Sequence, residues 1–378
     1  MIDFNRNINS QKKVTNDDIY TLLIDSMSYN HLLWLLPKVF EKRVSQRSSI
    51  DILRQYRESK LLKPCNVSQR NLIRLDTVFY NYLPSDFYGI ELSPVNPLGL
   101  NNILARINQK NILSAIRTTE VVADPTIALA IESAHRRSVL LESNPKDATT
   151  VKLSTSHRSL RLQSFDKIPG FTTHFKCFSL CTAGRGNKLF NFEIQNFKEH
   201  ISFYLSIIQK LKNNGFYIDD IVVSISDIRI IERIMNYYNL ERLYIIKHTQ
   251  DQTFDVFKKY DIGLPNYFDD TKILLPFTEK YGLHDAINLL MIFEKKLYTE
   301  LKKEYKNITF NFDLHRIAGM RYYDHVCFKI SAKNSLGNRY PLVDGGISSW
   351  TKKILHNNKE RLLTSGFGTE LFYRMFSS

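Results

Sequence analysis

The residues best suited to chemistry gather in one stretch, residues 151–185, which carries an unusual number of hydrogen-bond donors. Residues 151–163 alternate between two faces, which is the pattern of a β-strand. A connection containing Pro169 and Gly170 follows, and then a second run rich in β-formers over residues 171–182. A buried cation without a partner is costly, so an ordinary core hairpin would carry few such donors. The stretch predicts an antiparallel pair whose face binds an anion, with a solvated sheet face as the plainer alternative. Its donors are Arg158, Arg161, Gln163, His174, Lys176 and Arg185.

The composition limits the class of protein. The chain has 378 residues, of which 43% are hydrophobic and 12% aromatic, so it can bury a large core and is not a disordered chain. The formal net charge of +14 indicates affinity for a nucleic acid, a nucleotide or an acidic partner. The basic residues are spread along the chain, which favours a general effect of charge over a nucleic-acid site.

The sequence also predicts a compartment. Its start lacks the apolar core of a secretory signal, and no run of about 18 apolar residues predicts a membrane span. The four cysteines show no paired spacing typical of a metal or redox site, so we expect free thiols and a cytoplasmic protein.

The order of the predicted elements indicates three parts. An amphipathic helix over residues 69–83 precedes a strand that ends at Pro94, and Asp124 with Pro125 begins another helix. After the hairpin, helices dominate until strands return near residue 308. We therefore expect a helical region over residues 1–68, a core made of residues 69–190 and 306–378, and an intervening mixed, mostly helical region over residues 191–305.

This order resembles the catalytic core of class II aminoacyl-tRNA synthetases, nearest to the histidyl type. Residues Leu72–Pro94 resemble the first motif of that class. Residues Val121–Thr126 resemble the segment that holds the substrate amine with an acid and a threonine, which implies that role for Asp124 and Thr126. Residues Ala318–Tyr323 resemble a strand with paired tyrosines, which implies substrate binding by Tyr322 and Tyr323.

The second motif of the family places an arginine on one strand, and then an arginine or histidine before a phenylalanine that stacks on adenine. The hairpin resembles this motif in two registers. In one register Arg158 and His174 hold phosphates and Phe178 stacks on the base. In the other register, set by Gly184, Phe175 is the stacking residue. The two registers turn opposite faces of the hairpin toward the ligand.

The third motif is present only in part. Gly366 and Gly368 resemble its glycine turn, but Leu371 takes the place of the arginine that lies over the nucleotide. The sequence also has no segment after the core for an anticodon-binding domain. The resemblance therefore implies a paralogue rather than an ordinary tRNA synthetase. Such paralogues include a regulatory subunit of ATP phosphoribosyltransferase and amide-forming ligases.

The resemblance implies an α+β fold: an antiparallel sheet of six to seven strands flanked by helices, with an N-terminal helical region and an inserted, mostly helical subdomain. It also implies a homodimer, with ATP and Mg²⁺ as cofactors, because adenylate formation requires cations around the phosphates and a platform for adenine. The catalytic residues are then Arg158 and His174, and no metal ligand is identified. The expected substrate or nucleotide contacts are Glu120, Asp124, Thr126, Arg161, Gln163, Phe175, Phe178, Arg185, Tyr322, Tyr323, Asp344, Gly366 and Gly368.

Several of these residues have plainer roles open to them. Asp124 is equally suited to cap a helix, Asp344 to form a turn, and Phe175 and Phe178 to fill the core. Three functions follow. The first is a ligase that activates a small amino or carboxylic acid with ATP. The second is a regulatory protein that binds an amino acid without catalysis. The third is an RNA-binding paralogue.

Overall fold

The computed structural model describes residues 15–163, 170–241, 255–314, 316, 319–320 and 322–377. The chain divides into two compact units, one made of Met1–Lys63 and Ser114–Thr119 and the other of Pro64–Leu113 and Glu120–Ser378. Each unit is considered by itself.

The first unit consists of short helices that are held by their caps. Thr15 and Ser48 each form a capping box with an aspartate three residues later, which satisfies amide groups that the first turn leaves free. No residue of these helices is buried, so capping rather than a core supports them. The elements are α1 (Asn16–Thr21), the π-helix η1 (Leu22–Ser26), α2 (Tyr29–Val44), α3 (Ser49–Glu58), the 3₁₀-helix η2 (Lys60–Leu62) and strand β3 (Ser114–Ala115).

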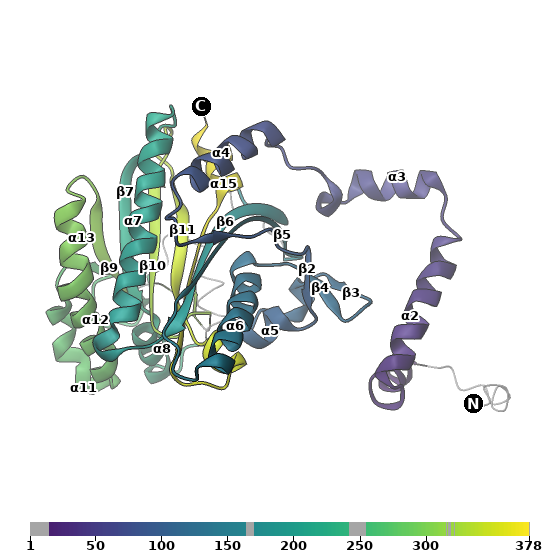
Figure 1. Ribbon diagram of the computed structural model, residues 1–378, viewed down its shortest axis with the longest axis horizontal. Coiled ribbons are helices and arrows are strands. Elements are labelled where there is room, and N and C mark those ends of the chain that lie inside the picture. The colour runs from purple at the N-terminus through teal and green to yellow at the C-terminus, as the bar shows by residue number, and fades with distance from the viewer. Residues whose placement is uncertain are drawn as a thin grey trace. The chain divides into compact units, whose positions relative to one another are not determined.

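The second unit is built on a nine-stranded mixed sheet in the order β1-β5-β6-β12-β11-β10-β7-β9-β8 (Figure 1). Two neighbouring pairs, β1 with β5 and β7 with β9, are parallel, and the other pairs are antiparallel. The strands are β1 (Tyr88–Gly89), β5 (Val151–Leu160), β6 (His174–Arg185), β7 (Asp219–Asp227), β8 (Tyr267–Phe268), β9 (Thr309–Asp313), β10 (Val326–Lys333), β11 (Arg339–Ser348) and β12 (Glu360–Phe367).

The expectation of six to seven antiparallel strands is therefore wrong in number and direction, although the α+β class is confirmed. The difference lies at the two edges of the sheet. Strand β1 adds in parallel at one edge, and β7 and β9 pair in parallel near the other. A parallel pair requires a long crossover, and the helices between Ile228 and Glu304 provide it. Strand β7 thus places part of the predicted intervening region inside the main sheet.

Helices cover the two faces of the sheet differently. The long helix α7 (Asn191–Asn213) packs against β6, β11 and β12, and runs in the direction of the neighbouring strands (Figure 1). With α4 (Gln69–Asn81), α12 (His284–Phe293) and α15 (Thr369–Phe376) it buries one face in the main core. On the other face, α6 (Pro125–Ser143) packs on β5 and β6 and against α14 (Trp350–Ile354). The remainder of that face, toward β7 and β9, is open.

The remaining elements are short. Strands β2 (Val95–Pro97) and β4 (Thr119–Val121) are neighbours in a small separate sheet. The other helices are α5 (Leu100–Ala105), η3 (Gln109–Asn111), η4 (Lys188–Phe190), α8 (Ile228–Tyr237), α10 (Val256–Lys259), η5 (Thr271–Phe277), α11 (Thr278–Tyr281), η6 (Glu294–Tyr298) and α13 (Thr299–Glu304). Among the described residues, no helix has the length and apolar character needed to cross a membrane.

A buried histidine of α7 gives the fold an acid sensitivity. His200 is fully buried, its Nδ1 lies 2.8 Å from the Ser365 hydroxyl and its Nε2 lies 3.0 Å from that of Thr182. Burial lowers the pKa of His200 to about 3, well below the value near 6.5 of an exposed histidine. Between these values the unfolded chain binds a proton that the folded chain does not, so stability falls as the pH falls.

We expect this histidine to remove about 2 kcal/mol of unfolding free energy between pH 7 and pH 5. Urea unfolding at a series of pH values measures the slope. His200→Gln should flatten the slope over this range, whereas His135→Gln, at an exposed position of α6, should keep it. Equal slopes in all three proteins would contradict the assignment.

Candidate functional site

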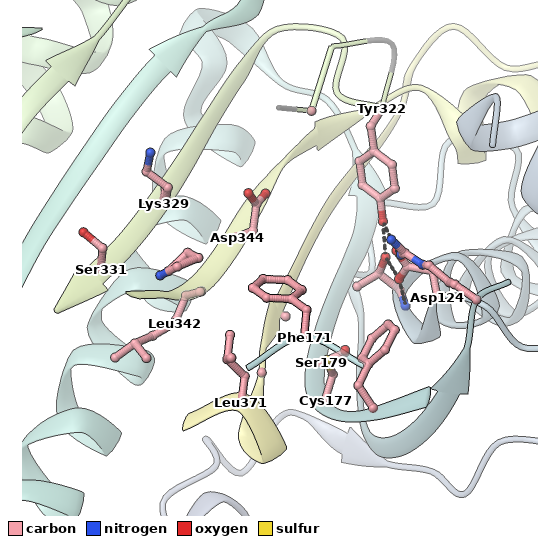
Figure 2. A pocket seen from close by; sticks show the side chains of 18 of the residues that line it. Asp124, Phe171, Cys177, Ser179, Tyr322, Lys329, Ser331, Leu342, Asp344 and Leu371 are labelled. Carbon is pink, nitrogen blue, oxygen red and sulfur yellow. Dashed lines mark hydrogen bonds and ion pairs between the residues drawn. The ribbon is translucent and has the colours of Figure 1, made fainter. Parts of the chain in front are cut away.

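The open part of the sheet face forms the floor of a cavity of about 1230 Å³ (Figure 2). The start of α6, strand β6, the strands from β7 to β12 and helix α15 all contribute to its lining. Ten residues expected from the sequence to bind ligand lie on it: Asp124, Thr126, Arg161, Gln163, Phe175, Tyr322, Tyr323, Asp344, Gly366 and Gly368.

Strand register explains why the floor is polar. Side chains alternate between the faces of a strand, and residues paired across the sheet point to the same side. One row of paired residues crosses six strands and lines the cavity: Asn311, Ser224, Lys329, Asp344, Gly366 and Ser179. Their neighbours along the strands turn the other way and fill the main core, among them Val223, Phe328, Val343, Phe367 and Phe178.

Asp124 organises one end of the cavity. Asp124 caps α6, since its Oδ1 accepts hydrogen bonds from the amide (2.9 Å) and the hydroxyl (2.7 Å) of Thr126. Its Oδ2 accepts from the Tyr322 hydroxyl at 3.0 Å and from Arg161 Nη2 at 2.8 Å. Burial raises the pKa of Tyr322, so this hydroxyl stays protonated. The expected helix cap is therefore present, and the carboxylate that makes it also lines the cavity.

Asp344 organises the middle of the floor. Both of its oxygens lie 2.8 Å from Arg316 Nη2, and Oδ1 also accepts from the Tyr323 hydroxyl at 2.5 Å. The Arg316 side chain is 2% exposed, whereas that of Asp344 is 49% exposed and reaches the cavity. The prediction of a turn at Asp344 is wrong, because the residue lies within strand β11. Sequence reasoning missed Arg316. The family that the sequence resembles has an arginine close by, at the position of Ala318 in this chain.

The two glycines after Asp344 are needed for close strand packing. A β-carbon on Gly345 would lie 2.6 Å from the Phe328 ring, and one on Gly346 would lie 2.6 Å from the Cys327 side chain. The sequence predicts a turn or a close backbone approach here, and the structure has the close approach.

The structure decides between the two hairpin registers. Phe175 lines the cavity, and the guanidinium of Arg161 lies 5.5 Å from the centre of its ring. Phe178 is fully buried on the opposite face, with its ring centroid 4.7 Å from that of Phe79. The register that turns Phe175 toward the cavity is the one present.

Five expected contacts lie away from the cavity lining. Arg158 pairs with Glu370 at 2.8 Å and lies 2.9 Å from His174 Nδ1. These two residues share the strand face of Phe178, because His174 lies four positions from Phe178 on β6 and Arg158 is paired with Lys176, two positions from Phe178. Arg185, at the far end of β6, donates to the Pro145 carbonyl. Glu120 accepts from the backbone amides of Gly99 and Asn101, a structural role.

Helix α15 brings a cation that the sequence reasoning missed. Leu371 lines the cavity as expected from the glycine turn, and so does Arg374, one turn further along the helix. Arg374 Nη2 donates to the Thr172 hydroxyl at 3.1 Å and pairs with Glu370 at 3.3 Å. The sequence signal that could have found Arg374 is its spacing of three residues from Leu371, which places both residues on one face of the helix.

A protein-held metal has little support in the residues present. Among the described positions no group of three histidine, cysteine or acidic side chains has a geometry that could hold a metal ion. The two acids on the cavity, Asp124 and Asp344, already accept hydrogen bonds at both oxygens. Mg²⁺ prefers one or two carboxylates together with substrate phosphates and water, so it fits here only with a nucleotide.

The sheet and its helices have the fold of histidyl-tRNA synthetase-like proteins, as comparison with solved structures shows. Two solved structures share it. An ATP phosphoribosyltransferase regulatory subunit/histidyl-tRNA synthetase from Bacillus halodurans has 16% identity and a TM-score of 0.57, over 84% of this chain and 83% of that chain. Histidyl-tRNA synthetase from a Nostoc species has 15% identity and a TM-score of 0.57, over 84% and 74%. No family model and no curated protein matches the chain. The resemblance seen in the sequence is thus confirmed at the level of the fold.

Proposed function

We propose that this protein is a synthetase-like ligase that activates a small amino or carboxylic acid with ATP. The observation that carries the proposal is the meeting of four separate segments on one cavity. Arg161 and Phe175 come from the hairpin, Asp124 and Tyr322 from the start of α6 and the loop before β10, and Gly366 from the end of β12. The solved structures of the same fold include a protein named as a synthetase.

The proposed chemistry has two steps. An oxygen of the acid's carboxylate attacks the α-phosphorus of ATP, the bond from that phosphorus to the bridging oxygen breaks, and pyrophosphate leaves. An amine or another acceptor then attacks the carbonyl carbon of the acyl adenylate, and AMP leaves. The first step concentrates negative charge on the phosphates, which guanidinium groups stabilise through paired hydrogen bonds. Arg161 and Arg374 have the positions on the cavity to do this, and Mg²⁺ enters with the nucleotide.

Arg158 and His174 then act as positioning residues rather than as groups that touch the nucleotide. Arg158 holds one oxygen of the Glu370 carboxylate, and the other oxygen pairs with Arg374. The contact between strand β5 and helix α15 therefore orients the guanidinium of Arg374 from behind the sheet.

Pyrophosphate exchange with a panel of amino and carboxylic acids tests the proposal. We expect ATP-dependent exchange with at least one acid, and Arg161→Ala should lower its rate by about ten- to a hundredfold, the effect of losing one charged hydrogen-bond donor. Arg136→Ala removes a half-exposed arginine of α6 that pairs with Glu132, and should leave the rate unchanged. No exchange with any acid, together with no binding of ATP in calorimetry, would contradict the proposal.

The lining of the cavity supports a regulatory protein, which binds an amino acid without catalysis, as a second candidate. At the glycine turn Leu371 presents an apolar side chain, and one face of the Phe175 ring is already covered by Arg161. A regulatory paralogue would bind the acid without ATP, so calorimetry with each ligand alone separates the two candidates. The homodimer and RNA binding by the basic amino-terminal region stay predictions from the sequence.

A further inference from the structure

The end of the cavity away from Asp124 has no role in the function proposed above. It is formed by β7, β9, β10 and β11, and we call it the Lys329 end. Its polar lining consists of Ser224, Asn311, Lys329, Ser331 and Arg339. Figure 2 shows Lys329 and Ser331 projecting from β10 beside Asp344, apart from the bonded pair of Asp124 and Tyr322.

Lys329 has donor capacity left for a ligand. Its ammonium nitrogen lies 3.4 Å from Asp313 Oδ2, a long contact for a charged pair, and its side chain is 31% exposed. An ammonium group carries three N–H donors, and Asp313 takes one of them. The side chain belongs to the row of floor residues, so strand register directs it into the cavity.

Two buried hydroxyls lie beside this ammonium group. The Ser331 oxygen accepts a hydrogen bond from Arg339 Nη1 at 3.1 Å, which leaves the hydroxyl proton free to donate. Ser331 is 7% exposed and Ser224 is 3% exposed, and both line the cavity. Buried hydroxyls are costly without partners, so a ligand atom that accepts hydrogen bonds is favoured here.

The neighbouring acids already have cationic partners. Both oxygens of Asp344 accept from Arg316, and one of them also accepts from Tyr323. Asp313, which is 3% exposed, faces Lys329. The Lys329 end offers the donors of Lys329 and Ser331 together with the Asn311 side-chain oxygen, which has no hydrogen-bond partner among the described residues. The charged donor favours a ligand group that is negatively charged. Asp313 and Asp344 would repel a doubly charged phosphate more strongly than a singly charged carboxylate.

We propose that the Lys329 end binds a second carboxylate of the substrate, so that the activated acid is dicarboxylic. The inference rests on the proposed function, because it assigns the remaining end of the same cavity. The Lys329 ammonium is the charge partner of this carboxylate, and the hydroxyls of Ser331 and Ser224 donate to it. Arg339 acts as a positioning residue that orients the Ser331 hydroxyl.

Calorimetry on the full chain tests this with L-glutamate and L-aspartate against L-glutamine and L-asparagine, which have nearly the same shape without the charge. We expect at least one acid to bind about ten- to a hundredfold more tightly than its amide, as for a charged hydrogen bond. Lys329→Met should abolish this preference. Lys333→Met is the matched control, since Lys333 lies on the same strand, pairs with Asp220 and is not among the residues lining the cavity.

Lys329→Met leaves Asp313 buried without its cation, and a resulting loss of folding would mask the effect on binding. A second variant separates the two effects. Lys329→Met combined with Asp313→Asn removes both charges, and its thermal unfolding is compared with that of the wild type. If the double variant folds and still prefers the acid over the amide, the proposal is wrong. Equal affinity of the wild type for acids and amides, or no binding of either, overturns it as well.

Pyrophosphate exchange distinguishes this failure from failure of the proposed function. Exchange that is supported by acids with a single carboxylate, and that is unaffected in Lys329→Met, would overturn the assignment of the second carboxylate. The proposed ligase function would still stand. Acid binding that depends on Lys329 without any exchange would instead support the assignment and count against the ligase.

Discussion

Replacing Phe178 by alanine is expected to lower the free energy of unfolding by about 3–5 kcal/mol, as for other fully buried phenylalanines. Its ring lies among the rings of Phe79, Tyr80 and Phe203, with centroid distances of 4.7, 5.2 and 5.9 Å. These contacts join the hairpin to α4 and α7, and a cavity left there cannot fill easily. Urea unfolding monitored by circular dichroism measures the loss.

Phe175→Ala is the matched control for this prediction. It removes the same side chain three residues away, on the strand face that lines the ligand cavity. We expect it to cost about 1 kcal/mol or less in stability, because a partly exposed ring loses little burial, and to weaken ATP binding instead. If Phe175→Ala were the more destabilising of the two, the assignment of the hairpin faces would be wrong.

Arg137→Ala should destabilise the protein by about 3–5 kcal/mol, since it removes one partner of a buried ion pair and leaves the other uncompensated. The Arg137 side chain is fully buried, and its Nε and Nη2 each lie 2.9 Å from an oxygen of Glu360. It also donates to Asp147 and to the Thr149 carbonyl. These bonds fix α6 on β12, and α6 carries Asp124 at its start, so ligand binding should weaken with stability.

The neighbouring Arg136→Ala provides the comparison, because Arg136 is about one third exposed, pairs with Glu132 on its own helix and lies 5.3 Å from the centre of the Tyr88 ring. Its loss should change the unfolding free energy by about 0.5 kcal/mol or less. The pair Arg137→Met with Glu360→Met should regain much of the lost stability, because no buried charge is then left alone. A loss in Arg137→Ala as small as that in Arg136→Ala would show that the pair does not clamp α6.

Local pattern predicted several elements closely. The amphipathic helix expected over residues 69–83 is α4, and its buried Leu72, Leu75 and Phe79 form an apolar stripe with the helical period. Such a stripe depends only on residues a few positions apart. The helix expected to begin at Asp124 and Pro125 is α6, which Asp124 caps. The prediction of the sheet was poorer, since pairing such as that of β7 with β9 joins residues that are far apart in the chain.

The sequence by itself determined the α+β class, the hairpin with its excess of donors, the cap at Asp124 and the resemblance to the class II synthetase core. These depend on residue type and short spacing, which act locally in the chain. Only the tertiary structure decided which donors face the cavity. Because a strand's side chains alternate, a shift of one position moves a residue from cavity to core, and cross-strand pairing sets that register. Pairing therefore placed Arg161 and Phe175 on the cavity, Arg158 and Phe178 behind the sheet, and Lys329 beside Asp344.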